Sequence, residues 1–273
     1  MKSIDLGRKA GRLVVYFHGA PGAVQEGLVF DGLAKKYDLR IVCFDRFSVD
    51  KTLGKEGYYQ LLADHIETLA SGKQVVLIGF SIGSYVALEV AGILGDRVSQ
   101  VHLISAVAPI TGGDFLDSMA GSLVFKLARD KPSAFFLLTQ CQRVLAVLAP
   151  SVLLKMLFSS AAGADKELIA QKSFQSHIAQ ILRECFQEGA TGYMRDINFY
   201  VTWHRIPQLR ARSVSIWHGS ADNWSPVAMT EYLSSTLSCA THVEVMNGLS
   251  HYSCLQEAAP LICASLGKMN ESE

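Results

Sequence analysis

The segment Gly-Phe-Ser-Ile-Gly at residues 79–83 is the clearest chemical signal in the sequence. It follows an apolar run and precedes an apolar stretch with helical spacing. A serine between two glycines, at a tight turn from a strand into a helix, projects its hydroxyl as a nucleophile. Side chains at Gly79 and Gly83 would strike the neighbouring strand and helix. The motif alone is common, but together with its flanking elements it predicts nucleophilic chemistry at Ser81.

A serine nucleophile needs a base, and the base needs an acid to orient it. In this strand–turn–helix arrangement the acid and then the histidine follow the serine along the chain. Asp222 and His251 each stand a few residues past an apolar run. Because the carboxyl ends of parallel strands share one edge of a sheet, we expect both beside Ser81. The alternative for Asp222 is an ordinary turn residue, in a loop that also holds Asn223 and Pro226.

Acyl transfer also needs two backbone N–H donors near the nucleophile, for the oxyanion. One is predicted at Ile82, directly after the serine, and the other at Ala20, in the segment His-Gly-Ala-Pro-Gly at residues 18–22. Pro21 has no N–H to offer. On its own this segment fits an ordinary Gly-Pro turn equally well. It lacks the G-x-x-x-x-G-K pattern of a phosphate-binding loop.

The elements that must position these residues follow from hydrophobic patterning. Short runs rich in Val, Ile and Leu predict strands at residues 13–17, 39–44, 74–78, 101–104, 214–217 and 242–246. Runs without polar alternation are typical of parallel strands buried on both faces. Helices are predicted between them at residues 24–37, 58–70, 82–94, 226–237 and 255–266. The alternation predicts an α/β fold with a mostly parallel central sheet flanked by helices.

This alternation breaks once, over residues 108–205. No strand pattern occurs there, and apolar residues recur at helical spacing, as in Leu123 with Leu127 and Phe125 with Ala128. A stretch of this length cannot be one loop of a compact domain. We therefore expect a core of residues 1–107 and 206–273, with a helical cap of residues 108–205 inserted between two core strands. The end of the chain, residues 268–273, is expected to be frayed.

The composition excludes several classes of protein. Of the 273 residues, 49% are hydrophobic and 18% charged, which indicates a folded domain. Lys plus Arg and Asp plus Glu number 25 each, so the formal net charge is zero and no nucleic-acid partner is predicted. The six cysteines stand singly, without zinc-ligand spacing, which indicates a reduced, cytosolic protein without a metal site.

No membrane insertion is predicted either. The N-terminus lacks the apolar run of a signal peptide. The most apolar region, residues 132–160, is interrupted by Arg143, Pro150 and Lys155. It falls short of the roughly 20 uninterrupted apolar residues that a transmembrane helix needs.

The segments quoted above, with Asp-Arg-Phe at residues 45–47, resemble the α/β-hydrolase family in type and in order over nearly the whole chain. The opening His-Gly-x-Pro-Gly and the segment at residues 193–207 are similar to capped, proline-iminopeptidase-like members. The family has a leading hairpin, whereas the stretch before residue 13 has room for one antiparallel strand, at residues 3–6.

The resemblance implies a triad of Ser81, Asp222 and His251, backbone oxyanion donors at Ala20 and Ile82, and no cofactor. It also implies that four residues where the cap returns to the core face the substrate pocket: Asp196, Phe199, Tyr200 and Trp203. Relatives that open epoxides or displace halide have an aspartate in place of the serine. The leading hypothesis is therefore a serine hydrolase that cleaves a carboxylic ester or related acyl bond of a small, mostly apolar substrate.

Three other functions stay open. A proline-iminopeptidase-like aminopeptidase would need an acid such as Glu184, Glu188 or Asp196 to hold the free amine. A receptor-like protein of this fold would bind a small ligand with little turnover. A lipid-surface enzyme would dock through the apolar segment at residues 134–157. An exposed apolar face of the cap could equally support a homo-oligomer.

Overall fold

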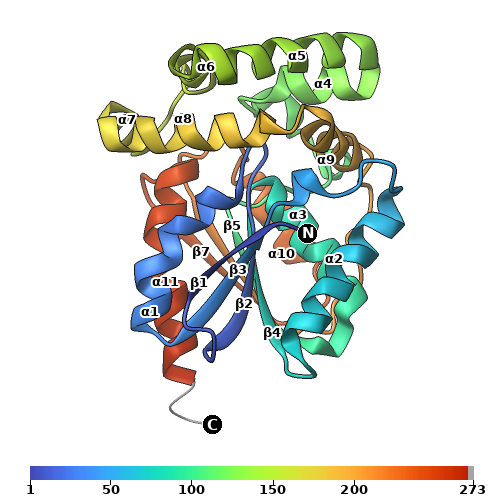
Figure 1. Ribbon diagram of the computed structural model, residues 1–273, viewed down its shortest axis with the longest axis vertical. Helices are drawn as coiled ribbons and strands as arrows, with labels where there is room; N and C mark the ends of the chain where they lie inside the picture. Colours follow the sequence, from blue (N-terminus) through green and yellow to red (C-terminus); the bar gives the residue numbers. More distant parts are fainter. Residues whose placement is uncertain (270–273) are drawn as a thin grey trace.

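The computed structural model describes residues 1–269, which form a seven-stranded sheet covered by helices (Figure 1). The strands are β1 (Ser3–Gly7), β2 (Arg12–Phe17), β3 (Leu39–Phe44), β4 (Val75–Phe80), β5 (Val98–Ile104), β6 (Ser213–Gly219) and β7 (Thr241–Met246). Their order is β1-β3-β2-β4-β5-β6-β7. Every neighbouring pair is parallel except β1 with β3. The predicted α/β class and the single antiparallel strand at the N-terminus are confirmed.

Helices cover both faces of the sheet, which explains why the central strands are apolar throughout. Helices α1 (Asp31–Lys36) and α11 (His251–Met269) lie on one face, and α2 (Lys55–Ala70) and α3 (Ile82–Leu94) on the other (Figure 1). Helix α10 (Ala228–Thr236) packs against β7. Every residue of β4 is buried, whereas the edge strand β7 has no fully buried residue. Sheet positions with helices on both sides thus account for the unalternated runs.

Four of the five predicted helices differ from the structure in their limits or character. Helix α2 begins three residues earlier than expected, and α10 lies within its expected range. The helix expected at residues 24–37 begins as a 3-10 helix, η1 (Val24–Phe30), before it continues as α1. The last helix, α11, begins at His251, four residues earlier than expected. Residues 270–273 of the expected frayed end lie outside the described residues.

The stretch between β5 and β6 is helical throughout its regular elements. It contains α4 (Ser122–Asp130), α5 (Pro132–Leu148), α6 (Pro150–Leu157), α7 (Asp165–Ala170), α8 (Lys172–Gln187) and α9 (Thr191–Val201). We propose that residues 108–205 form one inserted unit, the cap. Figure 1 shows it in two tiers: α7, α8 and α9 form a lower tier against the core, and α4, α5 and α6 an upper tier above them.

Among residues 1–269, no helix combines the length and apolarity needed to cross a membrane.

Candidate active site

Ser81 lies at the turn between β4 and α3, in a backbone conformation that few side chains adopt. Its φ is 53° and its ψ −127°, a strained combination of the kind found at functional sites. A Cβ on Gly79 would lie 2.5 Å from the Cα of Ser84, and one on Gly83 would overlap the carbonyl of Phe17. Both flanking glycines are therefore required by crowding, and the turn presents the serine at the carboxyl edge of the sheet.

Asp222 and His251 meet at this same edge. Nδ1 of His251 lies 2.8 Å from Oδ2 of Asp222, and both side chains are buried. The other carboxylate oxygen of Asp222 accepts hydrogen bonds from the N–H groups of Trp224 and Ser225, at 2.8 and 3.0 Å. Contacts on both oxygens fix the orientation of the carboxylate, and the carboxylate fixes the imidazole.

The electrostatics of this pair favour a charged imidazole. For Asp222, burial opposes ionisation, but the charge and hydrogen bond of His251 outweigh it and lower the pKa of the carboxyl group. For His251, burial opposes the imidazolium, but the charge and hydrogen bond of Asp222 raise the pKa above its ordinary value, with further contributions from Asp165 and Glu26. Asp222 can therefore stabilise the positive charge that forms when His251 accepts a proton.

Aromatic rings pack against the imidazole of His251. The ring of Phe80, the residue before Ser81, lies 4.8 Å from that of His251, centroid to centroid. The indole of Trp224 stacks on the imidazole of His251, with the ring centroids 5.5 Å apart and an angle of 17° between the ring planes. Within the described residues no hydrogen bond joins Ser81 to His251. Such contacts are often long in ligand-free enzymes and shorten when substrate binds.

A second histidine, His218, braces the loop that carries the acid. Its Nε2 lies 2.7 Å from the carbonyl of Ser225, and its Nδ1 lies 2.8 Å from the hydroxyl of Thr230. Burial lowers the pKa of His218. The neutral ring donates at Nε2 and accepts at Nδ1, so it supports the Asp222 turn without adding a competing charge.

The loop at residues 18–22 is held through the peptide group that joins Gly19 to Ala20. The carbonyl of Gly19 accepts a hydrogen bond from Arg46 at 3.0 Å, and Nδ1 of His18 lies 2.8 Å from it. The C=O and N–H of a trans peptide point in opposite directions. Among the described residues the Ala20 N–H donates no hydrogen bond, and Ile82 is the first residue of α3, where helices leave N–H groups unpaired.

Two buried charged residues hold this loop, and sequence reasoning assigned neither a role. Arg46 donates to the carbonyl of His18 at 2.5 Å as well as to that of Gly19. Glu26 accepts hydrogen bonds from the Gly19 N–H at 2.8 Å and from the Tyr16 hydroxyl at 2.7 Å. Burial raises the pKa of Glu26 to about 7. The signal available in the sequence was the placement of Arg46 two residues past the end of an apolar strand.

The structure places Asp196, which the resemblance put in the substrate pocket, elsewhere. Asp196 is buried and accepts a hydrogen bond from Nε of Arg46 at 2.6 Å, with Arg195 at 3.2 Å on its other oxygen. It therefore links the lower tier of the cap to the loop at residues 18–22 through Arg46. A carboxylate paired in this way is not available to a substrate amine.

The other three residues of that group also lie outside the pocket lining among the described residues. The hydroxyl of Tyr200 donates to the carbonyl of Ala108 at 2.9 Å, and the indole N–H of Trp203 donates to Glu89 at 2.8 Å. Phe199 packs against two tyrosines of α2. Asp196 and Tyr200 share one face of α9, which packs on the core, whereas the neighbouring face brings Tyr193 and Ile197 to the pocket. Trp203 lies past the end of that helix.

Asp165, at the start of α7, contacts the segment that carries His251. Its carboxylate accepts hydrogen bonds from the N–H groups of Tyr252 and Ser253, at 3.0 and 2.7 Å, and from the Ser253 hydroxyl at 2.7 Å. Because α11 begins at His251, these are first-turn N–H groups that lack partners within the helix. A residue of the cap thus caps the helix on which the catalytic histidine is expected.

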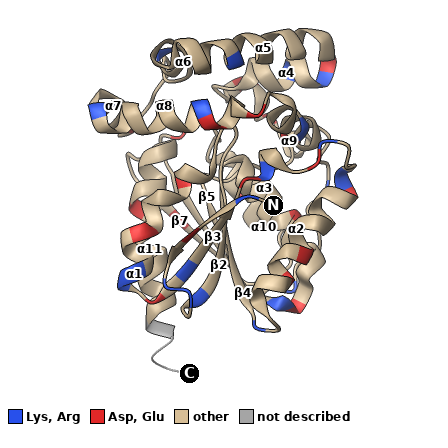
Figure 2. Cartoon of the chain, viewed as in Figure 1, with Lys and Arg blue, Asp and Glu red and all other residues tan. Residues whose placement is uncertain are grey.

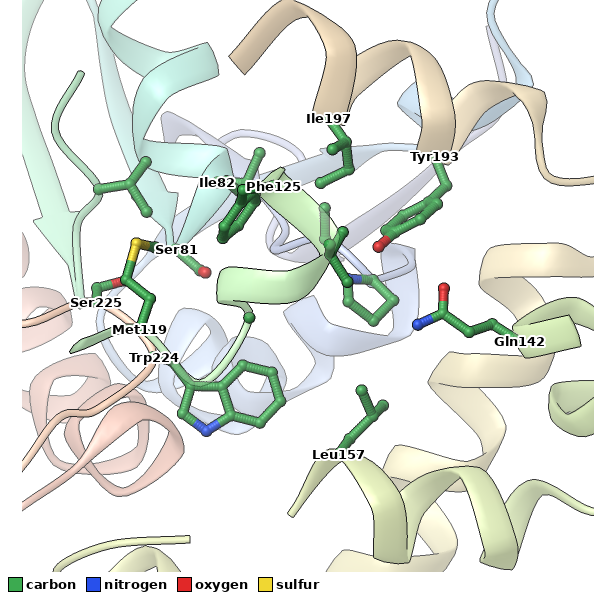
Figure 3. Close-up of a pocket in the computed structure, with 15 residues that line it drawn as sticks. Ser81, Ile82, Met119, Phe125, Gln142, Leu157, Tyr193, Ile197, Trp224 and Ser225 are labelled. Atoms are coloured by element: carbon green, nitrogen blue, oxygen red, sulfur yellow. The ribbon is translucent and has the colours of Figure 1, made fainter. Parts of the chain in front are cut away.

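Ser81, Ala20 and Ile82 open into one pocket between the core and the cap (Figure 3). Its volume is about 520 Å³, counted together with the space at its open side. Its lining consists of Ala20, Pro21, Ser81, Ile82, Val107, Met119, Gly121, Val124, Phe125, Gln142, Leu157, Tyr193, Ile197, Trp224 and Ser225. No cluster of His, Cys, Asp and Glu side chains that could hold a metal occurs among residues 1–269.

Comparison with known families gives one match. The sequence model of a family described as lipid-droplet associated hydrolase matches residues 56–254, well over half of the chain. The matched region contains Ser81, Asp222 and His251. Among curated proteins, none matches the sequence significantly.

Many solved structures resemble this one in fold. A bromoperoxidase from Bacillus anthracis has a TM-score of 0.64 and 17% identity, over 97% of this chain and 93% of that one. An alpha/beta hydrolase fold protein from Nakamurella multipartita has a TM-score of 0.63 and 15% identity, and the match covers 97% of this chain and 93% of that one. An esterase from Exiguobacterium antarcticum has a TM-score of 0.59 and 17% identity, and the match covers 97% of this chain and 94% of that one. At this level of identity the likeness shows the α/β-hydrolase fold.

Proposed function

The chain belongs to the lipid-droplet associated hydrolase family, and from this premise we propose that it is a serine hydrolase. Its substrate would be a carboxylic ester, or a related acyl compound, that is small and mostly apolar. The observation that carries the proposal is the buried pair of His251 and Asp222, 2.8 Å apart, beside a serine held in a strained turn at the mouth of an apolar pocket.

In this mechanism the hydroxyl of Ser81 attacks the substrate carbonyl while Nε2 of His251 takes its proton. Asp222 holds the opposite ring nitrogen and stabilises the imidazolium. The N–H groups of Ala20 and Ile82 bind the oxyanion of the tetrahedral intermediate. The imidazolium then protonates the leaving oxygen, and the acyl group stays on Ser81. Water, deprotonated by the same histidine, attacks the acyl-enzyme and releases the acid.

The aminopeptidase alternative is less well supported, because the acids it needs are engaged elsewhere. Asp196 is bonded to Arg46. Glu188 is paired with Lys2 at the surface, and Glu184 lies beside Glu188 in a separate polar cleft. Among the described residues, the lining of the pocket at Ser81 includes no acidic side chain. A free substrate amine would therefore find no counter-charge there.

A second candidate function, work at a lipid surface, is supported by the outside of the upper tier. Eight large apolar side chains are exposed there, and we call them the outer cap face: Leu123, Phe136, Leu137, Val144, Val147, Leu148, Val152 and Met156. Monomeric proteins seldom expose so many apolar side chains together. Figure 2 shows α5 and α6 almost free of charge; Arg143 is the only charged residue of α5 and Lys155 of α6.

We propose that the outer cap face lies on a phospholipid-covered neutral-lipid surface, in line with the family's description. A surface nearly without charges or hydrogen-bonding groups suits acyl chains better than a protein partner. The same two helices supply Gln142 and Leu157 to the pocket lining, so a substrate leaving the lipid would enter close to Ser81. A cytosolic location and a homo-oligomer stay predictions.

A panel of p-nitrophenyl esters and aminoacyl arylamides, with wild type and Ser81→Ala, tests the enzymatic proposal. We expect turnover of esters and not of arylamides, and a loss of about 10⁴-fold or more in Ser81→Ala. Ser71→Ala, at an exposed serine, is the matched control and should keep full activity. Arylamide turnover alone would favour the aminopeptidase, and saturable ligand binding without turnover would favour the receptor; either result contradicts the proposal.

A further inference from the structure

The end of the pocket away from Ser81 carries two polar side chains on otherwise apolar walls. Gln142 reaches in from α5 and Tyr193 from α9, and Figure 3 shows the amide and the hydroxyl both turned into the pocket, across it from Ser81. The remaining wall is apolar, with Val124, Leu157 and Ile197 among its members. Two polar groups that converge at one end of such a pocket are the usual means of fixing a ligand's orientation.

The folded chain supplies no hydrogen-bond partner, among the described residues, for the amide oxygen of Gln142 or the hydroxyl of Tyr193. The Oε1 atom of Gln142 is buried and has no hydrogen-bond partner among the described residues. Burial without a partner is costly for an amide, and a ligand that supplies a donor removes the cost. The ring of Tyr193 is fixed between Phe47, Phe135 and Phe186, so its hydroxyl is held at one position. An amide oxygen accepts a hydrogen bond, and a tyrosine hydroxyl can donate one.

The part of the substrate that reaches this end follows from the position of His251. The leaving group must lie near His251, which protonates it, and His251 is absent from the pocket lining among the described residues. The pocket instead runs from the predicted oxyanion donors, Ala20 and Ile82, toward Gln142. It should therefore hold the acyl part of the substrate. Its mostly apolar wall suits a hydrocarbon chain.

Resting on the proposed acyl hydrolysis, we propose that Gln142 and Tyr193 form a distal subsite that binds a hydroxyl group on the acyl chain of the substrate. A hydroxyl fits both side chains at once, because it donates to Oε1 of Gln142 and accepts from the hydroxyl of Tyr193. The substrate class is then an ester of a hydroxylated fatty acid. An unsubstituted chain of the same length would leave both groups unpaired and would be the poorer substrate.

The test uses p-nitrophenyl esters of ω-hydroxy acids and of the matching plain acids, in a homologous series of chain lengths. Wild type should prefer the hydroxy ester by about tenfold or more in kcat/KM at one chain length. Gln142→Leu should remove that preference and Tyr193→Phe should weaken it, because each variant deletes one of the two partners of the substrate hydroxyl. Gln140→Leu, on the same helix but outside the pocket lining, is the control and should keep the preference.

If Gln142→Leu keeps the preference, or if wild type never shows one, the subsite proposal is wrong. Failure of the enzymatic proposal would look different, because no ester would be turned over at any length. Calorimetric titration of wild type and Gln142→Leu with the free ω-hydroxy acids and plain acids then decides the subsite alone. Tighter binding of the hydroxy acid that is lost in Gln142→Leu supports it, and equal binding of the two acids overturns it.

Discussion

The two tiers of the cap differ in what they contact. The lower tier sends two buried carboxylates into the core: Asp196 to Arg46, which holds the loop at residues 18–22, and Asp165 to the first turn of α11. The upper tier contributes apolar pocket walls and exposes the outer cap face. Separating the lower tier from the core would leave charged groups or N–H groups buried and unpaired. Separating the apolar contacts of the upper tier would not.

The two tiers of the cap should therefore have different roles, one in supporting the site and the other in contacting the substrate and its surroundings. Substitutions in the lower tier should change stability and the reaction itself. Substitutions in the upper tier should change which acyl chain is accepted and which surface is bound, with little effect on folding.

The largest difference between the tiers is expected for their ion pairs. Asp196→Ala leaves the guanidinium of Arg46 fully buried next to a lost partner, and we expect the free energy of unfolding to fall by about 3–5 kcal/mol in urea titrations. Asp130→Ala in the upper tier removes an exposed pair with Arg129 and should leave the urea midpoint unchanged. Equal midpoints for the two variants would remove the distinction between the tiers.

The second contact of the lower tier gives a smaller effect with a chemical signature. Asp165→Ala leaves the N–H groups of Tyr252 and Ser253 buried without an acceptor, which should cost about 1–3 kcal/mol of unfolding free energy. Displacement of His251 should lower kcat/KM by roughly tenfold to a hundredfold. Glu167→Ala, at an exposed position of the same helix, should match wild type. Wild-type kcat/KM in Asp165→Ala would show that the cap does not position the histidine.

The pH profile separates the core's contribution to the site from that of the cap. His251 acts as a base only when neutral, and its pKa is raised above 6.5. Log kcat/KM should therefore rise with pH through an apparent pKa above 6.5, falling about tenfold per pH unit below it. Removing a negative charge lowers that pKa, so the acid limb should move to lower pH in both variants, further in Asp222→Asn than in Asp165→Asn. An apparent pKa at or below 6.5 in the wild-type profile would contradict the claim that Asp222 and Asp165 raise the pKa of His251.

The smallest effect on folding is expected at the outer cap face. Leu137 and Leu148 are 65% and 78% exposed, so changing both to Glu should alter stability by no more than about 0.5 kcal/mol. The double variant should hydrolyse short soluble esters like wild type but lose its flotation with phospholipid-covered triacylglycerol droplets. Leu261→Glu, at an exposed leucine of the core helix α11, is the control and should float normally. Droplet binding that survives in the double variant would rule out this face.

The difference between the tiers also marks how far the sequence could predict the structure. Strands, helices and the Ser81 turn depend on local patterns, such as unalternated apolar runs and two glycines at fixed spacing, and these were predicted. The contacts of Asp165 and Asp196 were not, because they join residues that lie far apart in the chain: Asp165 is 87 residues from Tyr252, and Asp196 is 150 residues from Arg46. A buried carboxylate looks like an exposed one in sequence until the fold supplies its partner.

The pocket shows the same limit at finer scale. The resemblance placed Asp196 and its neighbours at the pocket, and the structure brings Tyr193 and Ile197 of the same helix there instead. The orientation of α9 about its axis decides which of its residues reach the pocket. Apolar residues occur on both of the faces concerned, so the sequence does not show which face is turned toward the pocket. Gln142 carries no signal in the sequence, because glutamine is a mostly exposed residue type and nothing local marks this one as facing a pocket.

The central claim is that Ser81 is a nucleophile activated by His251, and covalent labelling tests it most directly. Intact protein is treated with a fluorophosphonate, and the modified peptide is identified by mass spectrometry. We predict one adduct per chain, on Ser81, that is absent in Ser81→Ala and forms far more slowly in His251→Ala. No adduct on the wild-type protein, or an adduct on another residue that persists in Ser81→Ala, would contradict the account.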